Sequence, residues 1–312
     1  MRPFLPANFQ EHIACPLCKS ELAWQSDACS CHTCGQQFRR RADGIWDFVI
    51  DHPPFMTHVL AEWQHGQDEY ESWDAKLGDD LQQHLEGIEG VREIYTTEFH
   101  LAGDVLDVGG HQGRLRHFLP TDAQYLGVDP YTESFERLAS QPNLVKAYPC
   151  LAQPCAFLRA QAERLPLKAE LFDYVHMRSV LDHFFDPLLA LLEAHRVLRP
   201  GGGLLLGLYA RGGASSIPDR SGAELLFARL RKKLRDEGWT RTGIAALRRV
   251  FGMGDHDDHV WHPTYNDLLV LLERANFTVE KVHWVKPPFE HVVFILGRKS
   301  ATHREFITRQ TY

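Results

Sequence analysis

A short apolar strand that runs directly into a glycine turn constrains this chain more than any other feature. Residues 104–108 read DVLDV, residues 109–113 read GGHQG, and the helix-like segment 114–119 follows. Glycines let the backbone bend sharply and let a ligand come close, and a helix N-terminus offers free amide donors. The pattern predicts an α/β fold with a ligand held at this turn.

The residues around the turn narrow the class of ligand. A dinucleotide fingerprint needs glycine at the first, third and sixth positions, but the third and sixth are His111 and Arg114. No Gly-Lys-Ser/Thr motif occurs, which excludes a Walker-type phosphate loop. The next apolar strand, 124–128, ends at Asp129, about 20 residues beyond the turn, where a carboxylate accepts hydrogen bonds from both ribose hydroxyls. The sequence predicts a nucleoside-type ligand.

Residues 104–209 resemble the class I S-adenosyl-L-methionine-dependent methyltransferases, particularly the small-molecule branch with the ubiquinone and menaquinone biosynthesis enzymes. Six segments carry the resemblance in the right order: 106–109 (LDVG), 127–129 (GVD), 162–166 (AERLP), 172–175 (FDYV), 180–183 (VLDH) and 197–202 (VLRPGG). The resemblance implies a doubly wound, seven-stranded Rossmann-like sheet in residues 101–299, with S-adenosyl-L-methionine as the cofactor.

The resemblance also implies which residues bind the cofactor. Asp107 and the glycine turn hold the methionine part, Asp129 holds the ribose, and Gln161 and Ala162 lie at the adenine edge. The full set is Asp107, Gly109, Gly110, His111, Gly113, Asp129, Pro130, Gln161, Ala162, Met177, Arg178 and Ser179. His111 stands where the family usually has glycine. Gln161 stands where it usually has aspartate, and the amide oxygen of Gln161 still accepts a hydrogen bond.

Five of the seven cysteines fall within residues 15–34, in two Cys-x-x-Cys pairs and one additional Cys29. An odd, clustered set in a chain without an export signal argues for metal binding over disulfides. Four thiolates at this spacing close a tetrahedron around a structural zinc ion, so residues 10–50 are predicted to be a zinc ribbon. Cys29 competes with Cys31 as the third ligand, and Cys31 is preferred because its spacing repeats the first pair. The predicted ligands are Cys15, Cys18, Cys31 and Cys34.

Three further segments surround these two units. Residues 51–100 are polar with scattered aromatics and are predicted to form a helical connector. Residues 210–262 form an insertion with a basic, amphipathic middle, which we interpret as a helical lid over the site. Residues 300–312 form a polar tail.

Local signals predict the elements of the C-terminal half. Asp186 and Pro187 open a helix, and Thr264 with Asp267 opens another. The first helix is expected to bury Leu188, Leu191, Leu192 and Val197. Segments 278–285 and 291–296 alternate as a hairpin that closes the sheet.

Methyl transfer is an in-line displacement at a sulfonium, so the protein aligns the nucleophile and removes its proton where necessary. Histidines near the methyl group are the natural bases, and the candidates are His183, His259 and His262. For His183 a purely structural hydrogen bond is an equal alternative. The expected acceptor is a small biosynthetic molecule, and the basic insertion favours one that is anionic or bound to a carrier.

Two rival functions stay open. Ribosomal RNA guanine methyltransferases also join a zinc ribbon to this fold, and Arg39, Arg40 and Arg41 favour RNA, whereas the net charge of -7 and pI of about 6.2 oppose it. A non-catalytic cofactor-binding scaffold is the other rival. No apolar run reaches the roughly 18 residues of a membrane span, and the start lacks a signal-peptide pattern, so a cytoplasmic protein without a membrane partner is expected. The oligomeric state is not predicted.

Overall fold

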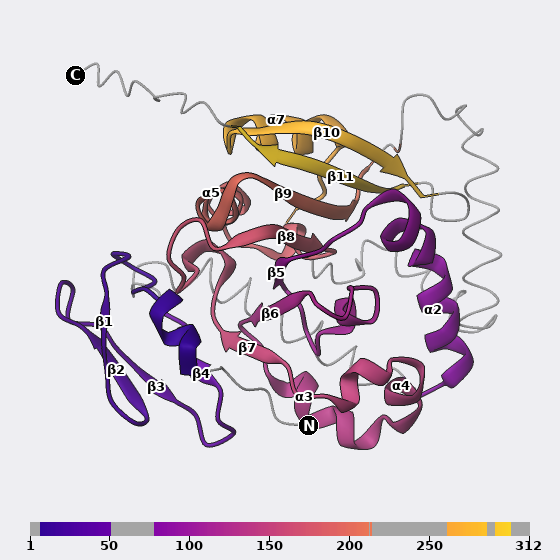
Figure 1. The fold of residues 1–312 in the computed structure, drawn as a ribbon. Helices are drawn as coiled ribbons and strands as arrows, with labels where there is room; N and C mark the ends of the chain where they lie inside the picture. Colours follow the sequence, from indigo (N-terminus) through magenta and orange to yellow (C-terminus); the bar gives the residue numbers. More distant parts are fainter. Residues whose placement is uncertain (1–6, 51–77, 212, 214–260, 286–290, 301–312) are drawn as a thin grey trace, which may run out of the picture.

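The computed structural model describes residues 7–50, 78–211, 213, 261–285 and 291–300. Within them one mixed sheet of 11 strands runs in the order β1-β2-β3-β4-β7-β6-β5-β8-β9-β11-β10. Figure 1 shows this sheet crossing the molecule, from the N-terminal strands on one side to the β10–β11 hairpin on the other. No helix among the described residues is both long enough and apolar enough to span a membrane.

The elements have the following bounds. The strands are β1 (Leu22–Trp24), β2 (Ala28–Cys31), β3 (Gln37–Arg40), β4 (Trp46–Asp47), β5 (Asp104–Val108), β6 (Gln124–Asp129), β7 (Ala156–Arg159), β8 (Phe172–Arg178), β9 (Leu198–Tyr209), β10 (Phe277–Trp284) and β11 (Val292–Lys299). The α-helices are α2 (Leu81–Glu93), α3 (Glu133–Arg137), α4 (Pro142–Ala147), α5 (Pro187–Val197) and α7 (Tyr265–Arg274). The short 3-10 helices are η1 (Ala7–His12), η4 (Arg114–His117), η5 (Leu138–Ser140), η6 (Pro149–Ala152), η7 (Ala162–Arg164) and η8 (Leu181–His183), and η3 (Ile94–Glu98) is a π-turn.

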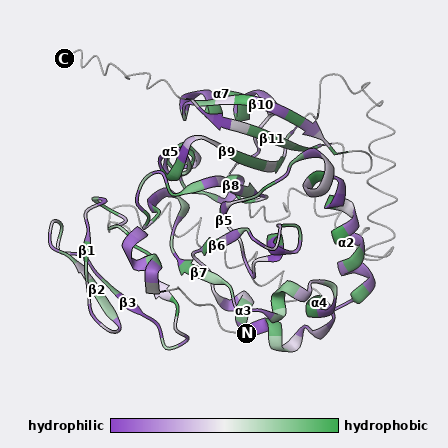
Figure 2. Ribbon diagram, in the orientation of Figure 1, coloured by the Kyte–Doolittle hydropathy of each residue, from purple (hydrophilic) through white to green (hydrophobic). Residues whose placement is uncertain are grey.

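The seven strands from β7 to β10 form the expected doubly wound sheet. Strands β7, β6, β5, β8 and β9 are parallel to their neighbours, and β11 runs antiparallel between β9 and β10. Figure 2 shows hydrophobic residues along β8, β9 and β11, as expected for strands buried on both faces. The chain winds one way from β5 to β7 and the other way from β8, so a crevice opens at the carboxyl ends of β5 and β8.

Helices α5 and α7 begin where the sequence predicts. The Asp186 carboxylate accepts a hydrogen bond from the Leu189 N–H, and Thr264 forms a capping box with Asp267. One expected core position is wrong, because Leu192 is 42% exposed. The buried face of α5 includes Leu191, Ala194 and Val197, which are three residues apart. Leu192 lies about 100° around the helix from Leu191 and so points away from this face.

The segment after the glycine turn is shorter than expected. Instead of a helix over 114–119, the chain makes the single 3-10 turn η4 (Arg114–His117), in which the Phe118 N–H bonds to the Leu115 carbonyl. Pro120 limits this helix, because a residue that precedes proline is disfavoured in the α conformation.

Other predicted segments lie partly or wholly outside the described residues. Of the connector, the structure describes α2 and η3, and hydrophobic and hydrophilic residues alternate around α2 (Figure 2). Residues 51–77 of the connector, 214–260 of the predicted lid and 301–312 of the tail are outside the described part of the chain, and so is His259.

The N-terminal module, residues 7–50, continues the sheet. Strands β1 to β4 pair antiparallel in sequence, and β4 pairs in parallel with β7 through Trp46 opposite Leu158 and Asp47 opposite Arg159. Aromatic rings fill its small core, with the Trp24 and Trp46 ring centroids 4.8 Å apart. This pairing makes the module an edge extension of the main sheet.

Candidate active site

The turn after β5 has the conformation that its glycines allow. Gly109 has φ +71, and a Cβ built there would lie 2.3 Å from Val180 Cγ1, so only glycine fits. His111 also has a left-handed backbone, with φ +48, although it is not glycine. Its N–H donates a hydrogen bond to Asp129 Oδ2 across 3.2 Å. The turn and the predicted ribose carboxylate are therefore in direct contact.

A cavity of about 490 Å³ lies over this turn, at the carboxyl ends of the parallel strands. This size is typical of a pocket for a small ligand. The lining includes ten of the residues predicted to bind the cofactor: Asp107, Gly109, Gly110, His111, Asp129, Pro130, Gln161, Ala162, Arg178 and Ser179. Segments between Asp107 and Ser179 that are distant in the sequence thus meet at one cavity.

Two of the predicted cofactor residues lie elsewhere. Met177 is fully buried in the hydrophobic core and does not line the cavity. Gly113 also lies outside the lining, and its φ of +82 makes the bend that starts η4. Met177 and its neighbour Arg178 differ because successive side chains of a strand point to opposite faces.

The predicted histidines are dispersed. His183 lines the cavity, with its side chain mostly buried and its Nε2 atom 4.0 Å from Asp182 Oδ1. His262 is exposed and does not line the cavity. The residue directly before it, Trp261, packs beside η8, where its indole N–H donates to the Leu181 carbonyl across 3.3 Å.

A buried polar chain that the sequence did not indicate forms part of the cavity wall. Asp107 accepts hydrogen bonds from the Tyr125 hydroxyl across 2.9 Å and from His176 Nδ1 across 2.7 Å. His176 Nε2 lies 2.9 Å from the Tyr95 hydroxyl. Because a carboxylate only accepts, His176 is assigned the tautomer with Nδ1 protonated, and Nε2 accepts from Tyr95. Burial raises the pKa of Tyr95 to about 12, which keeps this donor protonated.

The sequence analysis did not identify Tyr95 or His176 as site residues. Both line the cavity. The available signal was register: His176 occupies β8 opposite Asp107 of β5, and side chains at paired positions of neighbouring strands share a face.

The two ends of the cavity differ in charge. At the β6–β7 end lie the carboxylates of Asp129 and Glu163. At the β5–β8 end lie Arg114 and Arg178 beside Tyr148. Burial raises the pKa of Tyr148, and the charges of the two guanidinium groups oppose this rise. The β5–β8 end therefore carries two guanidinium groups and one carboxylate, that of Asp107, which Tyr125 and His176 already hold.

The side chain of Gln161 forms hydrogen bonds with the backbone of Ile50. Its Oε1 atom accepts from the Ile50 N–H across 3.3 Å, and its Nε2 atom donates to the Ile50 carbonyl across 3.4 Å. Gln161, which stands where the family that the sequence resembles usually has aspartate, therefore connects the cavity to the N-terminal module.

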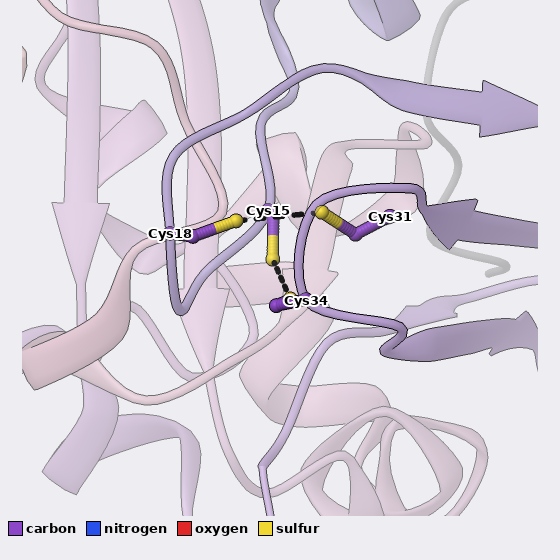
Figure 3. A group of neighbouring side chains, drawn as sticks. All are labelled: Cys15, Cys18, Cys31 and Cys34. Carbon is purple, nitrogen blue, oxygen red and sulfur yellow. Dashed lines mark hydrogen bonds between the residues drawn. The ribbon is translucent and has the colours of Figure 1, made fainter.

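Four cysteines of the module form a compact cluster (Figure 3). Cys15 Sγ lies 3.5 Å from Cys34 Sγ, and Cys18 Sγ lies 3.4 Å from Cys31 Sγ. All four sulfur atoms lie within 4.8 Å of one another. The cluster contains Cys31 and not Cys29, whose buried thiol has its pKa raised to about 12 by burial.

The two cysteine pairs have the same local geometry. After each pair comes a residue with a left-handed backbone, Lys19 with φ +61 and Gly35 with φ +76. The N–H of each of these residues donates to the carbonyl of the first cysteine of its pair across 2.9 Å. Two equivalent turns thus present their thiols to a common centre.

Comparison with known proteins finds a similarity in the main domain. Residues 106–206 match the family model described as a methyltransferase domain. Over 105 residues the chain is 31% identical to an uncharacterized methyltransferase, C1B3.06c, of Schizosaccharomyces pombe. That alignment covers 31% of this chain and 37% of the relative, so the chain spans little more than a third of the curated relative's length.

Two solved structures illustrate the similarity in fold. One is the 1,6-didemethyltoxoflavin-N1-methyltransferase of Burkholderia thailandensis, with a TM-score of 0.45, 14% identity, and coverage of 90% of this chain and 100% of that chain. The other is the PH0226 protein of Pyrococcus horikoshii OT3, with a TM-score of 0.47, 17% identity, and coverage of 70% and 92%. At these values neither carries an argument about the chemistry of this chain.

Proposed function

We propose that this chain is an S-adenosyl-L-methionine-dependent methyltransferase that acts on a small biosynthetic acceptor by in-line methyl transfer. Its residues 106–206 match the family model of a methyltransferase domain. The observation that carries the proposal is the hydrogen bond from the His111 N–H to Asp129 Oδ2, beside one shared cavity. A turn that receives a ligand and an acid that receives a ribose must lie this close to serve one adenosyl group.

The donor set of the cavity fits the proposed cofactor. Asp129 accepts from the N–H groups of His111 and Tyr131, which hold its carboxylate at the cavity wall, and a carboxylate is a suitable acceptor for ribose hydroxyls. Gly109 lacks a side chain, and Val180 lies too close for one, so the backbone of the turn stays uncovered at this position. When bound, the cofactor supplies a methyl group on a positively charged sulfur.

The opposite end of the cavity suits an acceptor with a negative charge. Arg114 and Arg178 line it together with Tyr148. His183 lines the same cavity, where its imidazole can take a proton from the acceptor as the methyl group is transferred. Binding and alignment of an anionic small molecule are therefore assigned to this end.

The cysteine cluster fits a structural zinc ion. Zinc–thiolate bonds of about 2.3 Å in a tetrahedron place sulfur atoms roughly 3.8 Å apart. The two sulfur–sulfur distances of 3.5 and 3.4 Å lie near this value, and all four thiols are free of disulfides. Four protein ligands leave no open position, so the ion would stabilise the module without taking part in the reaction.

RNA is the second candidate acceptor. Arg39 and Arg40 are exposed on the module, which favours contact with phosphates. Against it, Arg40 also holds the Gly44 carbonyl and Arg41 pairs with Asp43 across 3.0 Å, so these side chains are partly committed within the module.

Calorimetric titration with S-adenosylhomocysteine tests the cofactor assignment. We expect binding to the intact chain, and Asp129→Ala should weaken it by at least about tenfold, because hydrogen bonds to a charged group contribute about 1.5–3 kcal/mol. Asp122→Ala, at an exposed position of the same region, should bind normally. Absence of binding to the intact chain would contradict the proposal and favour the scaffold alternative.

A second experiment identifies the acceptor class. The protein is incubated with methyl-labelled cofactor and a cell extract separated into small molecules and RNA. We expect label in the small-molecule fraction, and weaker transfer after Arg114→Met, a variant at a lining residue outside the predicted cofactor set. Label confined to RNA would replace the small-molecule proposal with the RNA alternative.

A further inference from the structure

One stretch of the cavity wall, the loop of residues 159–168, is held at both ends by the N-terminal module. The loop leaves β7, passes through η7, and contributes Gln161, Ala162 and Glu163 to the cavity lining. Figure 1 shows β4 of the module beside β7, where this loop starts. The sequence resemblance implies that Gln161 and Ala162 of this stretch lie at the adenine edge of the cofactor.

The first end of the loop is held by strand β4 and the chain that follows it. The Phe48 N–H donates to the Arg159 carbonyl across 2.8 Å. The Arg159 guanidinium donates to Asp47 Oδ2 across 2.6 Å and to the Pro130 carbonyl across 2.8 Å. Gln161 then makes its two hydrogen bonds to Ile50. Arg159 thus links the module to the residue that follows the ribose carboxylate.

The second end is held by the backbone around the first cysteine pair. Ala14, directly before Cys15, donates its N–H to the Pro166 carbonyl across 3.0 Å. Lys19, directly after Cys18, donates from Nζ to the Leu165 carbonyl across 3.0 Å. The residues that flank the two cysteines therefore hold this end of the loop together with Arg196 of α5, whose guanidinium donates to the Leu167 carbonyl across 2.7 Å and to the Leu165 carbonyl across 3.3 Å.

Lys19 is tightly constrained in this contact. Its Nζ atom also donates to the Pro16 carbonyl across 3.0 Å and pairs with Glu193 Oε2 of α5 at 2.5 Å. Glu193 is itself held by Arg196, whose Nε atom lies 2.7 Å from Glu193 Oε1. One ammonium group therefore joins the cysteine turn, the loop and helix α5 in a largely buried position.

We propose that the N-terminal module is a structural part of the cofactor site, in which Lys19, Arg159 and Gln161 are positioning residues for the adenine edge. The inference rests on the proposed function. Metal bound at the cysteine cluster would fix the turn from Cys15 to Lys19 and, through it, loop 159–168. A module without metal would release this end of the loop and weaken cofactor binding, although no ligand atom of the metal touches the cavity.

The test measures S-adenosylhomocysteine affinity on the full, zinc-loaded chain by calorimetry. Lys19→Met keeps the aliphatic stem, leaves Glu193 paired with Arg196 and removes the shorter of the two hydrogen bonds to the Leu165 carbonyl, the other coming from Arg196. We expect the Kd to rise by about fivefold to tenfold, less than the loss of a charged hydrogen bond made directly to the cofactor would cause, because Lys19 acts through the loop, and Lys19→Arg to recover part of it. Asp47→Asn, which removes the partner of Arg159 outside the cavity, should act in the same direction.

The matched control is Lys168→Met. Lys168 pairs with Glu21 across 3.3 Å and also bridges the module and the main domain, but both side chains are exposed. Because exposed ion pairs contribute little, its Kd should stay within about twofold of the original. Thermal unfolding and zinc content, measured for every variant, separate a local effect from loss of the fold.

Two further readouts locate the effect. The weakening should carry over to 5′-methylthioadenosine, which keeps the adenosine part and lacks the amino acid part. Zinc removal by a chelator should weaken S-adenosylhomocysteine at least as much as Lys19→Met, if the main domain stays folded. Folded Lys19→Met and Asp47→Asn variants that bind with unchanged affinity would overturn the inference, whereas no binding to the intact chain would overturn the proposed function.

Discussion

His176 and Asp107 lie at paired positions of the parallel strands β8 and β5, and their side chains meet with Nδ1 2.7 Å from Oδ1. Both side chains are almost fully buried. A buried carboxylate is stable only where donors surround it, and Asp107 obtains two, from His176 and Tyr125. The floor of the cavity therefore depends on a polar contact between two strands.

Removal of the imidazole should destabilise the protein strongly. In His176→Leu the Asp107 carboxylate loses a donor and Tyr95 loses its acceptor, so the free energy of unfolding should fall by about 3–5 kcal/mol. Tyr95→Phe, which removes only the outer hydroxyl, should cost about 1 kcal/mol. Urea denaturation measures both, and equal costs for the two variants would contradict a central role for the His176–Asp107 contact.

The glycine turn offers a comparison between two glycines with nearly equal backbone angles. Gly109→Ala should cost several kcal/mol, roughly 3 or more, and abolish cofactor binding, because its Cβ would overlap Val180 Cγ1. Gly201 has φ +76 and nothing within 4 Å of a built Cβ, so Gly201→Ala should cost only about 1 kcal/mol for the backbone strain. Similar losses in the two variants would show that packing at Gly109 is unimportant.

The cysteine cluster predicts which thiols bind metal. Zinc content by mass spectrometry should fall in Cys31→Ala and stay at about one ion per chain in Cys29→Ala, since a four-thiolate site needs Cys31. Cys29→Ala should lose only the packing of a small buried side chain, about 1 kcal/mol. Metal loss in Cys29→Ala with metal retained in Cys31→Ala would reverse the assignment.

Glu163 provides a prediction about pH. Burial raises the pKa of Glu163, although the N–H groups of Asp186 and Phe185 donate to its carboxylate and oppose the rise. In the window between the unfolded pKa and the raised folded pKa the native state holds more protons, so the stability from this group falls as pH rises. The stability from Glu163 is fully present below the unfolded value and is lost above the folded value.

Glu163→Gln keeps the shape and an acceptor oxygen but does not titrate. It should therefore be more stable than the original chain at neutral pH, and the difference should disappear below about pH 4, near the ordinary glutamate pKa. Thermal unfolding from pH 4 to 8 measures the difference. A difference that does not depend on pH would contradict a raised pKa at Glu163.

Features that short stretches of chain specify were visible before the fold was known. The strand and glycine turn that start at residue 104, the acid at Asp129, the caps at Asp186 and Thr264, and the closing hairpin all follow from local backbone preference and alternation. The paired cysteine spacing likewise identified four thiols that lie together. Such signals are local because steric limits and hydrogen bonds between near neighbours produce them.

Contacts between distant segments depended on the folded chain. Sequence periodicity did not show that His176 would meet Asp107 and Tyr95, because strand order and register decide which side chains share a face. It also did not show that Gln161 would bind Ile50, 111 residues away. Leu192 was misplaced for the same reason, since the buried face of a helix is set by what packs against it. These long-range contacts form only when the sheet brings β4 beside β7 and β5 beside β8.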